Sequence, residues 1–306
     1  MERVSLGRTG LMVSRLGVGL AEMGRESGPD AVSKAGRILN TALDAGINFL
    51  DTAECYGCSE ERIGFTVSHR RHEFVLATKV GHTPTGMTGT PWTGETVRAS
   101  IDHSLTAMKT DYVDLLQVHA YDAPHPPPDD VLLAVEDARD AGKVRFVGFS
   151  QENEEAGWAV ESGLFDTLQT AFSLLDQRAR YGLLDRAREN GLGIIAKRPI
   201  ANAVWGRIAV EGYYSTDGIA EQLLERARLM QGVRPLDGAP EDSIELALGF
   251  VLAHEQVDTA IVGTRNPEHM LANIRMVEKS LPLEGTLVAE LHRLYDEVGS
   301  DWPSID

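Results

Sequence analysis

Short apolar runs recur along the whole chain, and segments with helical spacing lie between them. The runs are nearly continuous in apolar character, which is typical of strands covered on both faces. We predict strands over residues 16–20, 47–50, 74–78, 113–118, 144–149, 167–171, 192–196 and 259–262. Between them, apolar residues three or four apart mark helical faces, for example Val97, Ile101, Leu105 and Met108. This alternation predicts a parallel sheet covered by helices.

An open doubly wound sheet and a closed barrel both fit this alternation. The glycines after the first strand, at positions 17, 19 and 24, do not have the G-x-G-x-x-G spacing of an open dinucleotide-binding sheet. Polar residues instead stand at the ends of nearly all strands: Asp51, Lys79, His119, Ser150, Gln169, Arg198 and Thr264. In a (β/α)8 TIM barrel these ends gather on one face, where active sites form. The sequence therefore predicts an α/β protein with this barrel.

The remaining segments fit one barrel domain over residues 1–306, although this length also allows two domains. The first residues predict a β-hairpin that turns between Gly7 and Gly10 and covers the opposite face of the barrel. Extra helices are expected after the last strand. The proline-rich stretch DAPHPPPDD is too short for an interdomain hinge and is expected to be a loop.

Charge narrows the classes of partner. The chain has 29 basic and 46 acidic residues, a net charge of -17, which argues against nucleic acid as a partner. Any anionic cofactor must therefore be held by local positive groups or backbone N–H donors. We find no apolar stretch long enough for a membrane span, and the start, MERVSLGRTG, has no signal-peptide core. We expect a cytoplasmic protein.

The two cysteines, Cys55 and Cys58, have C-x-x-C spacing. That spacing fits a redox pair or half of a zinc site. Zinc would require two further soft ligands at similar spacing, and the chain has no other cysteine. We therefore expect no metal, and interpret both as small residues of a loop.

One group of polar residues indicates proton transfer. Lys79 ends a buried strand, and a carboxylate from the neighbouring strand, Asp51, would compensate its charge. A phenol is a poor acid at neutral pH, but a nearby ammonium lowers its pKa, so Lys79 would make Tyr56 a general acid. A neutral His119 would then orient a substrate oxygen. A purely structural ion pair is the alternative for Asp51 and Lys79.

Several ordered motifs together resemble the aldo-keto reductases over essentially the whole chain. They are GINFLDTAECYGCSEERIG, FVLATKVG, VDLLQVH, VGFSQ and AIVGTRNPEHMLANI. The resemblance implies a (β/α)8 barrel that binds NAD(P)H and transfers hydride to an aldehyde or ketone. It also implies a catalytic tetrad of Asp51, Tyr56, Lys79 and His119.

The same resemblance implies the cofactor contacts: Ser150, Gln151, Gln169, Arg198, Pro199, Ala201, Gly263, Thr264, Arg265, His269 and Asn273. Lys197 and Arg198 are unusual there and would add positive charge, beside a loop whose backbone N–H groups could bind phosphate. The chain departs from the family pattern at Phe172, where many members have tyrosine, and at Ala272, where many have an acid. Trp92 and Tyr121 are candidate substrate walls or, equally, loop-packing residues.

We expect NADPH as the cofactor, with NADH possible, and a small carbonyl compound as the substrate. Arg265 would bind the 2′-phosphate that distinguishes NADPH, because a guanidinium engages phosphate through two parallel hydrogen bonds. An NAD-dependent sugar or polyol dehydrogenase is one alternative. A regulatory subunit that retains the cofactor site is another.

Overall fold

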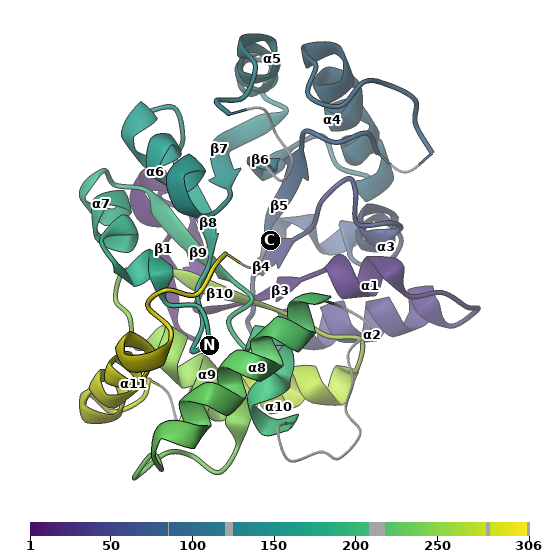
Figure 1. The fold of residues 1–306 in the computed structure, drawn as a ribbon. Coiled ribbons are helices and arrows are strands. Elements are labelled where there is room, and N and C mark those ends of the chain that lie inside the picture. The colour runs from purple at the N-terminus through teal and green to yellow at the C-terminus, as the bar shows by residue number, and fades with distance from the viewer. Residues whose placement is uncertain (85, 120–124, 208–217, 280–281, 305–306) are drawn as a thin grey trace.

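The computed structural model describes residues 1–84, 86–119, 125–207, 218–279 and 282–304 (Figure 1). All predicted strands form, and they close into a parallel barrel in the order β10-β3-β4-β5-β6-β7-β8-β9. Their bounds are β3 (Leu16–Gly19), β4 (Phe49–Asp51), β5 (Val75–Val80), β6 (Val113–His119), β7 (Val144–Ser150), β8 (Thr167–Ala171), β9 (Gly193–Lys197) and β10 (Thr259–Gly263). The predicted (β/α)8 barrel is therefore confirmed.

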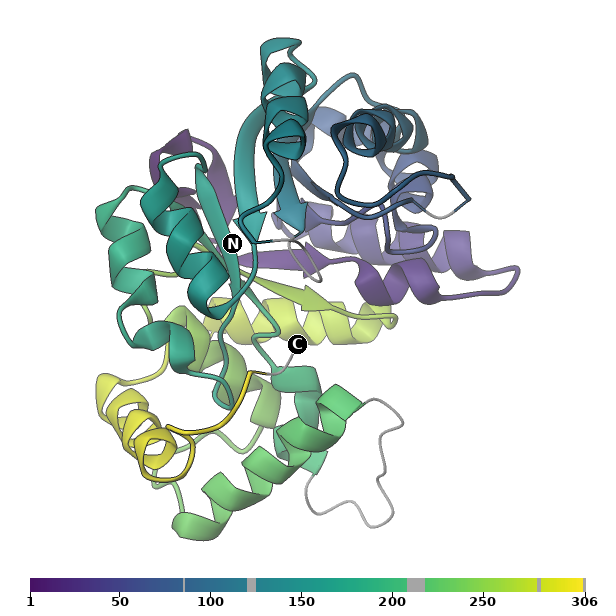
Figure 2. The same ribbon diagram turned by 45° about the horizontal axis from the view of Figure 1, so that its top comes forward.

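Helices surround the barrel in Figures 1 and 2. They are α1 (Ala21–Arg25), α2 (Ala31–Asp44), α3 (Ser59–Thr66), α4 (Gly94–Met108), α5 (Asp129–Asp140), α6 (Asn153–Ser162), α7 (Leu183–Glu189), α8 (Gly218–Val233), α9 (Ser243–Leu252), α10 (Pro267–Lys279) and α11 (Gly285–Val298). Helix α11 is the expected C-terminal addition, whereas α8 is a further helix between β9 and α9. Within the described ranges, none of these helices is both long and apolar enough to cross a membrane.

The first residues close the amino-terminal end of the barrel, as predicted. Strands β1 (Arg3–Ser5) and β2 (Met12–Ser14) pair antiparallel. Leu6 is fully buried in a cluster with Phe49 and Ile195 inside the barrel. Gly7 passes so close to β9 that a Cβ would lie 2.2 Å from the Gly193 nitrogen. The hairpin therefore fills the bottom of the barrel and leaves the carboxyl ends of the strands for a site.

The inward face of three neighbouring strands changes from apolar to polar toward their carboxyl ends. Alternate residues of a strand point to the same side. Apolar residues of the inner cluster are followed two positions later by polar ones: Phe49 by Asp51, Ala77 by Lys79, and Leu115 by Gln117. This step places a buried polar layer directly above the apolar filling of the barrel.

Candidate active site at the carboxyl ends of the strands

Three side chains donate hydrogen bonds to the Asp51 carboxylate inside the barrel mouth. Lys79 Nζ donates to Asp51 Oδ2 at 2.5 Å. The Nε2 atoms of Gln117 and Gln169 donate to Asp51 Oδ1 at 2.9 and 2.8 Å. All four side chains are buried. Burying a carboxylate is costly unless it is paired and hydrogen-bonded, and this set of donors meets both requirements.

Lys79 is fully buried and remains charged. Desolvation by itself lowers the pKa of an ammonium group, but the Asp51 carboxylate and the Tyr56 phenol outweigh it, so the pKa of Lys79 is raised. Lys79 Nζ also donates to the Thr52 carbonyl at 3.0 Å. The barrel mouth therefore contains a fixed cation that water does not reach.

Tyr56 reaches Lys79 from the loop after β4. The Tyr56 amide donates to the Ala53 carbonyl at 3.1 Å, and the Tyr56 carbonyl accepts from the Ser59 amide at 3.1 Å, which forms a tight turn into α3. Gly24 of α1 packs on this turn, since a Cβ there would lie 1.7 Å from the Tyr56 carbonyl oxygen. The turn holds the Tyr56 ring with its centroid 5.0 Å from Lys79 Nζ.

The protonation of Tyr56 differs from the expectation drawn from the sequence. Burial raises the pKa of Tyr56, and the charge of Lys79 opposes this effect without overcoming it. The expected net lowering of the Tyr56 pKa is therefore not met in this structure, because the sequence does not show how far the ring is desolvated. The phenol is protonated at neutral pH, which is the form that can donate a proton.

His119, at the end of β6, is the fourth member of the predicted tetrad. Its ring stands edge-on to Tyr56, with centroids 5.9 Å apart. Burial lowers the pKa of His119 well below its usual value, and the positive charges of Lys79 and Lys197 act in the same direction. His119 is therefore neutral at neutral pH, as the sequence predicts, and one ring nitrogen donates while the other accepts.

Two buried residues at this site are absent from the sequence-based prediction. Gln117 interrupts the apolar run of β6 two positions before His119, and this polar interruption is the signal that identifies it. Glu54, in the loop after β4, accepts a hydrogen bond from the His82 amide at 3.1 Å on Oε1. Burial raises the pKa of Glu54 to about 8. Nothing in the sequence marks Glu54 as buried, because it lies in a polar loop.

Ser150, Gln151 and Gln169 lie together at the ends of β7 and β8. Ser150 pairs with Gln169 in the strand register, and its Oγ donates to Gln169 Oε1 at 3.4 Å. The Gln151 amide donates to the Gln169 carbonyl at 3.1 Å. The Gln169 side-chain nitrogen is already bound to Asp51 and Gln117.

The loop after β9 has an unusual backbone. Four of its residues have positive φ: Arg198 (57°), Ala201 (44°), Asn202 (55°) and Ala203 (58°). Such angles are uncommon for residues other than glycine and concentrate at functional sites. Pro199 and Ala201 are buried. The amides of Ala201 and Ala203 donate to the carbonyls of Arg198 and Ile200, so these two expected phosphate donors are used within the loop.

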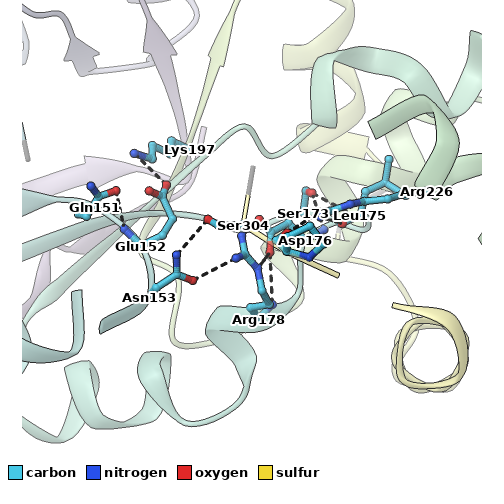
Figure 3. A network of polar contacts seen from close by, with 11 residues as sticks. Gln151, Glu152, Asn153, Ser173, Leu175, Asp176, Arg178, Lys197, Arg226 and Ser304 are labelled. Atoms are coloured by element: carbon cyan, nitrogen blue, oxygen red, sulfur yellow. Dashed lines mark hydrogen bonds and ion pairs between the residues drawn. The ribbon is translucent and has the colours of Figure 1, made fainter. Parts of the chain in front are cut away.

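Lys197 is compensated rather than free, contrary to the expectation from the sequence. Its Nζ lies 2.9 Å from Glu152 Oε1 (Figure 3). Beside this pair, Arg178 Nη1 donates to Asn153 Oδ1 at 3.0 Å, and Asn153 Nδ2 donates to Ser304 Oγ at 3.0 Å. These contacts fasten the C-terminal segment to the start of α6. They also border a cavity of about 170 Å³, which includes none of the tetrad residues in its lining.

The residues after β10 form the turn that leads into α10. Thr264 Oγ1 accepts from the Asn266 amide at 3.0 Å, and Asn266 Oδ1 caps the helix by accepting from the Glu268 amide at 3.0 Å. Thr264 and Asn273 are buried. Gly263, Arg265 and His269 are exposed, so they are the accessible members of the cofactor contacts predicted after β10.

Arg265 has an acidic neighbour that the sequence does not reveal. Its Nε lies 3.6 Å from Glu22 Oε2, and about half of each side chain is exposed. Exposed ion pairs contribute roughly 0–1 kcal/mol, so an incoming phosphate can displace Glu22. Glu22 nevertheless lowers the positive potential at this position.

One of the two candidate substrate walls is placed near the tetrad. Trp92 packs over the end of β5, where its amide donates to the Gly81 carbonyl at 2.9 Å. Its ring lies 5.6 Å from that of His82, which in turn lies 5.2 Å from the His119 ring, between centroids. Tyr121 lies outside the described residues.

Known proteins resemble this chain over nearly its whole length. It is 31% identical to the uncharacterized oxidoreductase YrpG of Bacillus subtilis, with 99% of this chain and 98% of the relative covered. It is 26% identical to L-galactose dehydrogenase of Arabidopsis thaliana, with 99% and 98% covered. Among solved structures, the aldo-keto reductase AKR11C1 from Bacillus halodurans in its holo form superposes with a TM-score of 0.79, at 28% identity, over 96% of each chain.

The family profile described as "Aldo/keto reductase family" matches residues 15–295, which include every strand of the barrel. The fold, the relatives and this match agree. The chain therefore belongs to the aldo/keto reductase family and is an NAD(P)H-dependent oxidoreductase.

Proposed function

We propose that this protein reduces an aldehyde or a ketone to an alcohol with NADPH, with Tyr56 as the proton donor. The observation that carries this proposal is the arrangement of Lys79. It is fully buried, bound to Asp51 at 2.5 Å, and faces the Tyr56 ring at 5.0 Å. A purely structural ion pair would not need a tyrosine and a neutral histidine beside it at the ends of neighbouring strands.

NADPH, when bound, supplies the hydride that the carbonyl carbon accepts. Tyr56 donates its phenolic proton to the carbonyl oxygen. With the hydride on carbon and the proton on oxygen, the carbonyl group becomes an alcohol. Lys79 stabilises the phenolate that Tyr56 becomes, and Asp51 keeps Lys79 charged and in place. The neutral His119 ring donates a hydrogen bond that orients the carbonyl oxygen toward Tyr56.

The described residues fit a nicotinamide dinucleotide at both of its ends. Ser150 Oγ and Gln169 Oε1 form a buried polar pair suited to a carboxamide. The amino-terminal end of α10 and the exposed Arg265 are suited to the ribose phosphate, since helix starts and guanidinium groups both attract phosphate. The loop after β9 would have to release its internal hydrogen bonds before its amides could contribute.

A cofactor titration followed by a turnover assay tests the function. We expect NADPH to bind, as measured by cofactor fluorescence, and to be oxidised when a panel of aldehydes, ketones and sugars is added. Cofactor binding without turnover of any carbonyl compound would instead support a regulatory subunit.

The second candidate is an NAD-dependent sugar or polyol dehydrogenase. Two relatives act on sugars by name: L-galactose dehydrogenase of Arabidopsis thaliana and 6-dehydroglucose reductase of Novosphingobium aromaticivorans. Glu22 beside Arg265 also favours this candidate, because a carboxylate repels a 2′-phosphate and accepts from a ribose hydroxyl. Oxidation of sugars with NAD+ in the same assay would support it.

The choice between the cofactors depends on Arg265 and Glu22. We expect Arg265→Ala to weaken NADPH binding about 10- to 100-fold, because a hydrogen bond between charged groups is lost, and to leave NADH nearly unchanged. Glu22→Gln is the matched change and should tighten NADPH binding. Dissociation constants for both cofactors in the three proteins test this. If Arg265→Ala lost the same amount of affinity for NADPH and for NADH, Arg265 would not contact the 2′-phosphate.

The raised pKa of Tyr56 predicts the pH dependence of reduction. Reduction needs the protonated phenol, so kcat/KM should fall only above the ordinary tyrosine pKa of about 10. Lys79→Met should move this alkaline limb to still higher pH, because the opposing positive charge is lost. Profiles of both proteins, with activity rechecked at neutral pH to control for inactivation, test this. A limb that moves to lower pH in Lys79→Met would contradict it.

A further inference from the structure

A thiol and two imidazoles meet beside the proposed tetrad. Cys55 follows β4, His82 follows β5, and His119 ends β6, so three successive strand ends bring them together. One ligand atom from each lies within 4.8 Å of the others. Cys55 Sγ is 3.7 Å from His119 Nδ1. The proposed reduction uses His119 but requires neither Cys55 nor His82.

A buried carboxylate stands behind this cluster. Glu54 Oε1 lies 3.9 Å from His82 Nδ1 and also accepts from the His82 amide at 3.1 Å. Glu54 is 3% exposed, and its Oε2 has no hydrogen-bond partner among the described residues. In metal sites the second ring nitrogen of a histidine ligand usually donates to a carboxyl group, and a shift of less than about 1 Å would bring Glu54 Oε1 within hydrogen-bond distance of His82 Nδ1.

We propose that Cys55, His82 and His119 bind one zinc ion, and that zinc binding inhibits the enzyme. Thiolate sulfur and neutral imidazole nitrogen are preferred ligands of Zn²⁺, and three protein ligands leave a fourth position for water. The C-x-x-C spacing predicted no zinc site because the chain has no further cysteine. The fold supplies histidines from two other strands instead, and Cys58 is not part of the cluster.

Binding requires the loss of one proton. An ordinary thiol is protonated at neutral pH, whereas zinc binds the thiolate. The thiol therefore loses its proton to water as the zinc–sulfur bond forms. His119 is neutral before binding and needs no such step. No oxidant or reductant takes part.

The inhibition rests on the proposed function, whereas the binding does not. A zinc ion on His119 takes up a ring nitrogen of the residue that orients the substrate oxygen. It also adds positive charge close to Lys79, which already acts on both Cys55 and His119. We expect zinc to compete with the carbonyl substrate and chelation by EDTA to restore activity.

The binding is tested with Co²⁺ as a spectroscopic substitute and with Zn²⁺ in competition against a chromogenic chelator. The proteins are the wild type, Cys55→Ser and the matched control Cys58→Ser, since both cysteines are exposed members of one loop. We expect one equivalent of metal and a thiolate-to-cobalt charge-transfer band in wild type and Cys58→Ser. Cys55→Ser should lose the band and bind zinc more than about 100-fold more weakly, beyond the range for outer-sphere partners.

The possible outcomes separate the two proposals. Absence of the charge-transfer band in the wild type, or equal zinc affinity in wild type and Cys55→Ser, would overturn the metal site. If the protein binds metal as described but reduces no carbonyl compound, the proposed function fails while the site stands. Turnover assays with increasing ZnCl₂ complete the test. The inhibition constant of zinc, measured for each protein against its activity without zinc, should be higher in Cys55→Ser than in the wild type. In Cys58→Ser it should equal that of the wild type.

Discussion

Tyr56→Phe is expected to lower kcat for carbonyl reduction by about 10²- to 10⁴-fold, the usual contribution of general acid catalysis. The change removes the transferred proton and leaves the ring. The ring keeps its edge contact with His119 and its position in front of Lys79, while the hydrogen bond between the hydroxyl and Lys79 is lost. The affinity for NADPH should therefore change little.

Steady-state rates with the best substrate of the panel, together with NADPH titrations, measure both effects of Tyr56→Phe. Thermal unfolding controls for loss of the fold. A variant that retains most of its kcat would show that the proton comes from elsewhere. A variant that loses NADPH binding as well would show that the hydroxyl serves the cofactor rather than the substrate.

Substitutions at Asp51 and Lys79 are expected to have unequal effects on stability. In Lys79→Met the Asp51 carboxylate also loses its counter-ion, but the hydrogen bonds from Gln117 and Gln169 still stabilise it. In Asp51→Leu, by contrast, Lys79 loses its counter-ion and keeps its hydrogen bond to the Thr52 carbonyl. An uncompensated buried charge costs about 3–5 kcal/mol. Both variants leave a buried charge without its counter-ion, and Asp51→Leu should be the less stable of the two because Lys79 keeps fewer hydrogen-bond partners than Asp51 does.

Both substitutions should impair catalysis, whatever their stability. Without Lys79 nothing stabilises the phenolate, and we expect a loss of about 10²- to 10³-fold in kcat, similar to the removal of one stabilising donor elsewhere. Asp51→Asn preserves the shape of the side chain but removes its charge and one of its two acceptor oxygens. Three donors converge there, so Lys79 would be held less well and kcat should fall. Urea unfolding and kcat at neutral pH test the series. If Lys79→Met were stable and fully active, the ion pair between Asp51 and Lys79 would have no role in catalysis.

The barrel is predictable from the sequence because its strands are local patterns. The apolar runs are buried along most of their length, and they match the observed strands to within about two residues at either end. The tetrad is predictable for the same reason, since its members stand at or just after strand ends. Helix α8 is not, because no pattern in the sequence before it signals an insertion between β9 and α9.

The rest of the site depends on contacts between segments far apart in the chain. The partners of Asp51 at Gln117 and Gln169 are 66 and 118 residues away. The ion pair between Lys197 and Glu152 cancels a charge that the sequence offers to phosphate. The pKa of Tyr56 depends on how far the folded chain removes water from its ring. Composition and spacing contain none of these distances.

Transfer of deuterium from cofactor to product tests the central claim most directly. NADPH in which deuterium replaces both hydrogens at the reactive carbon of the nicotinamide ring is incubated with the wild-type protein and its best carbonyl substrate. Mass spectrometry of the alcohol should show one deuterium at the new carbinol carbon for each cofactor oxidised, and Tyr56→Phe should form almost none in the same time. Oxidation of the cofactor without deuterium in an alcohol, or equal labelling by Tyr56→Phe, would contradict this mechanism.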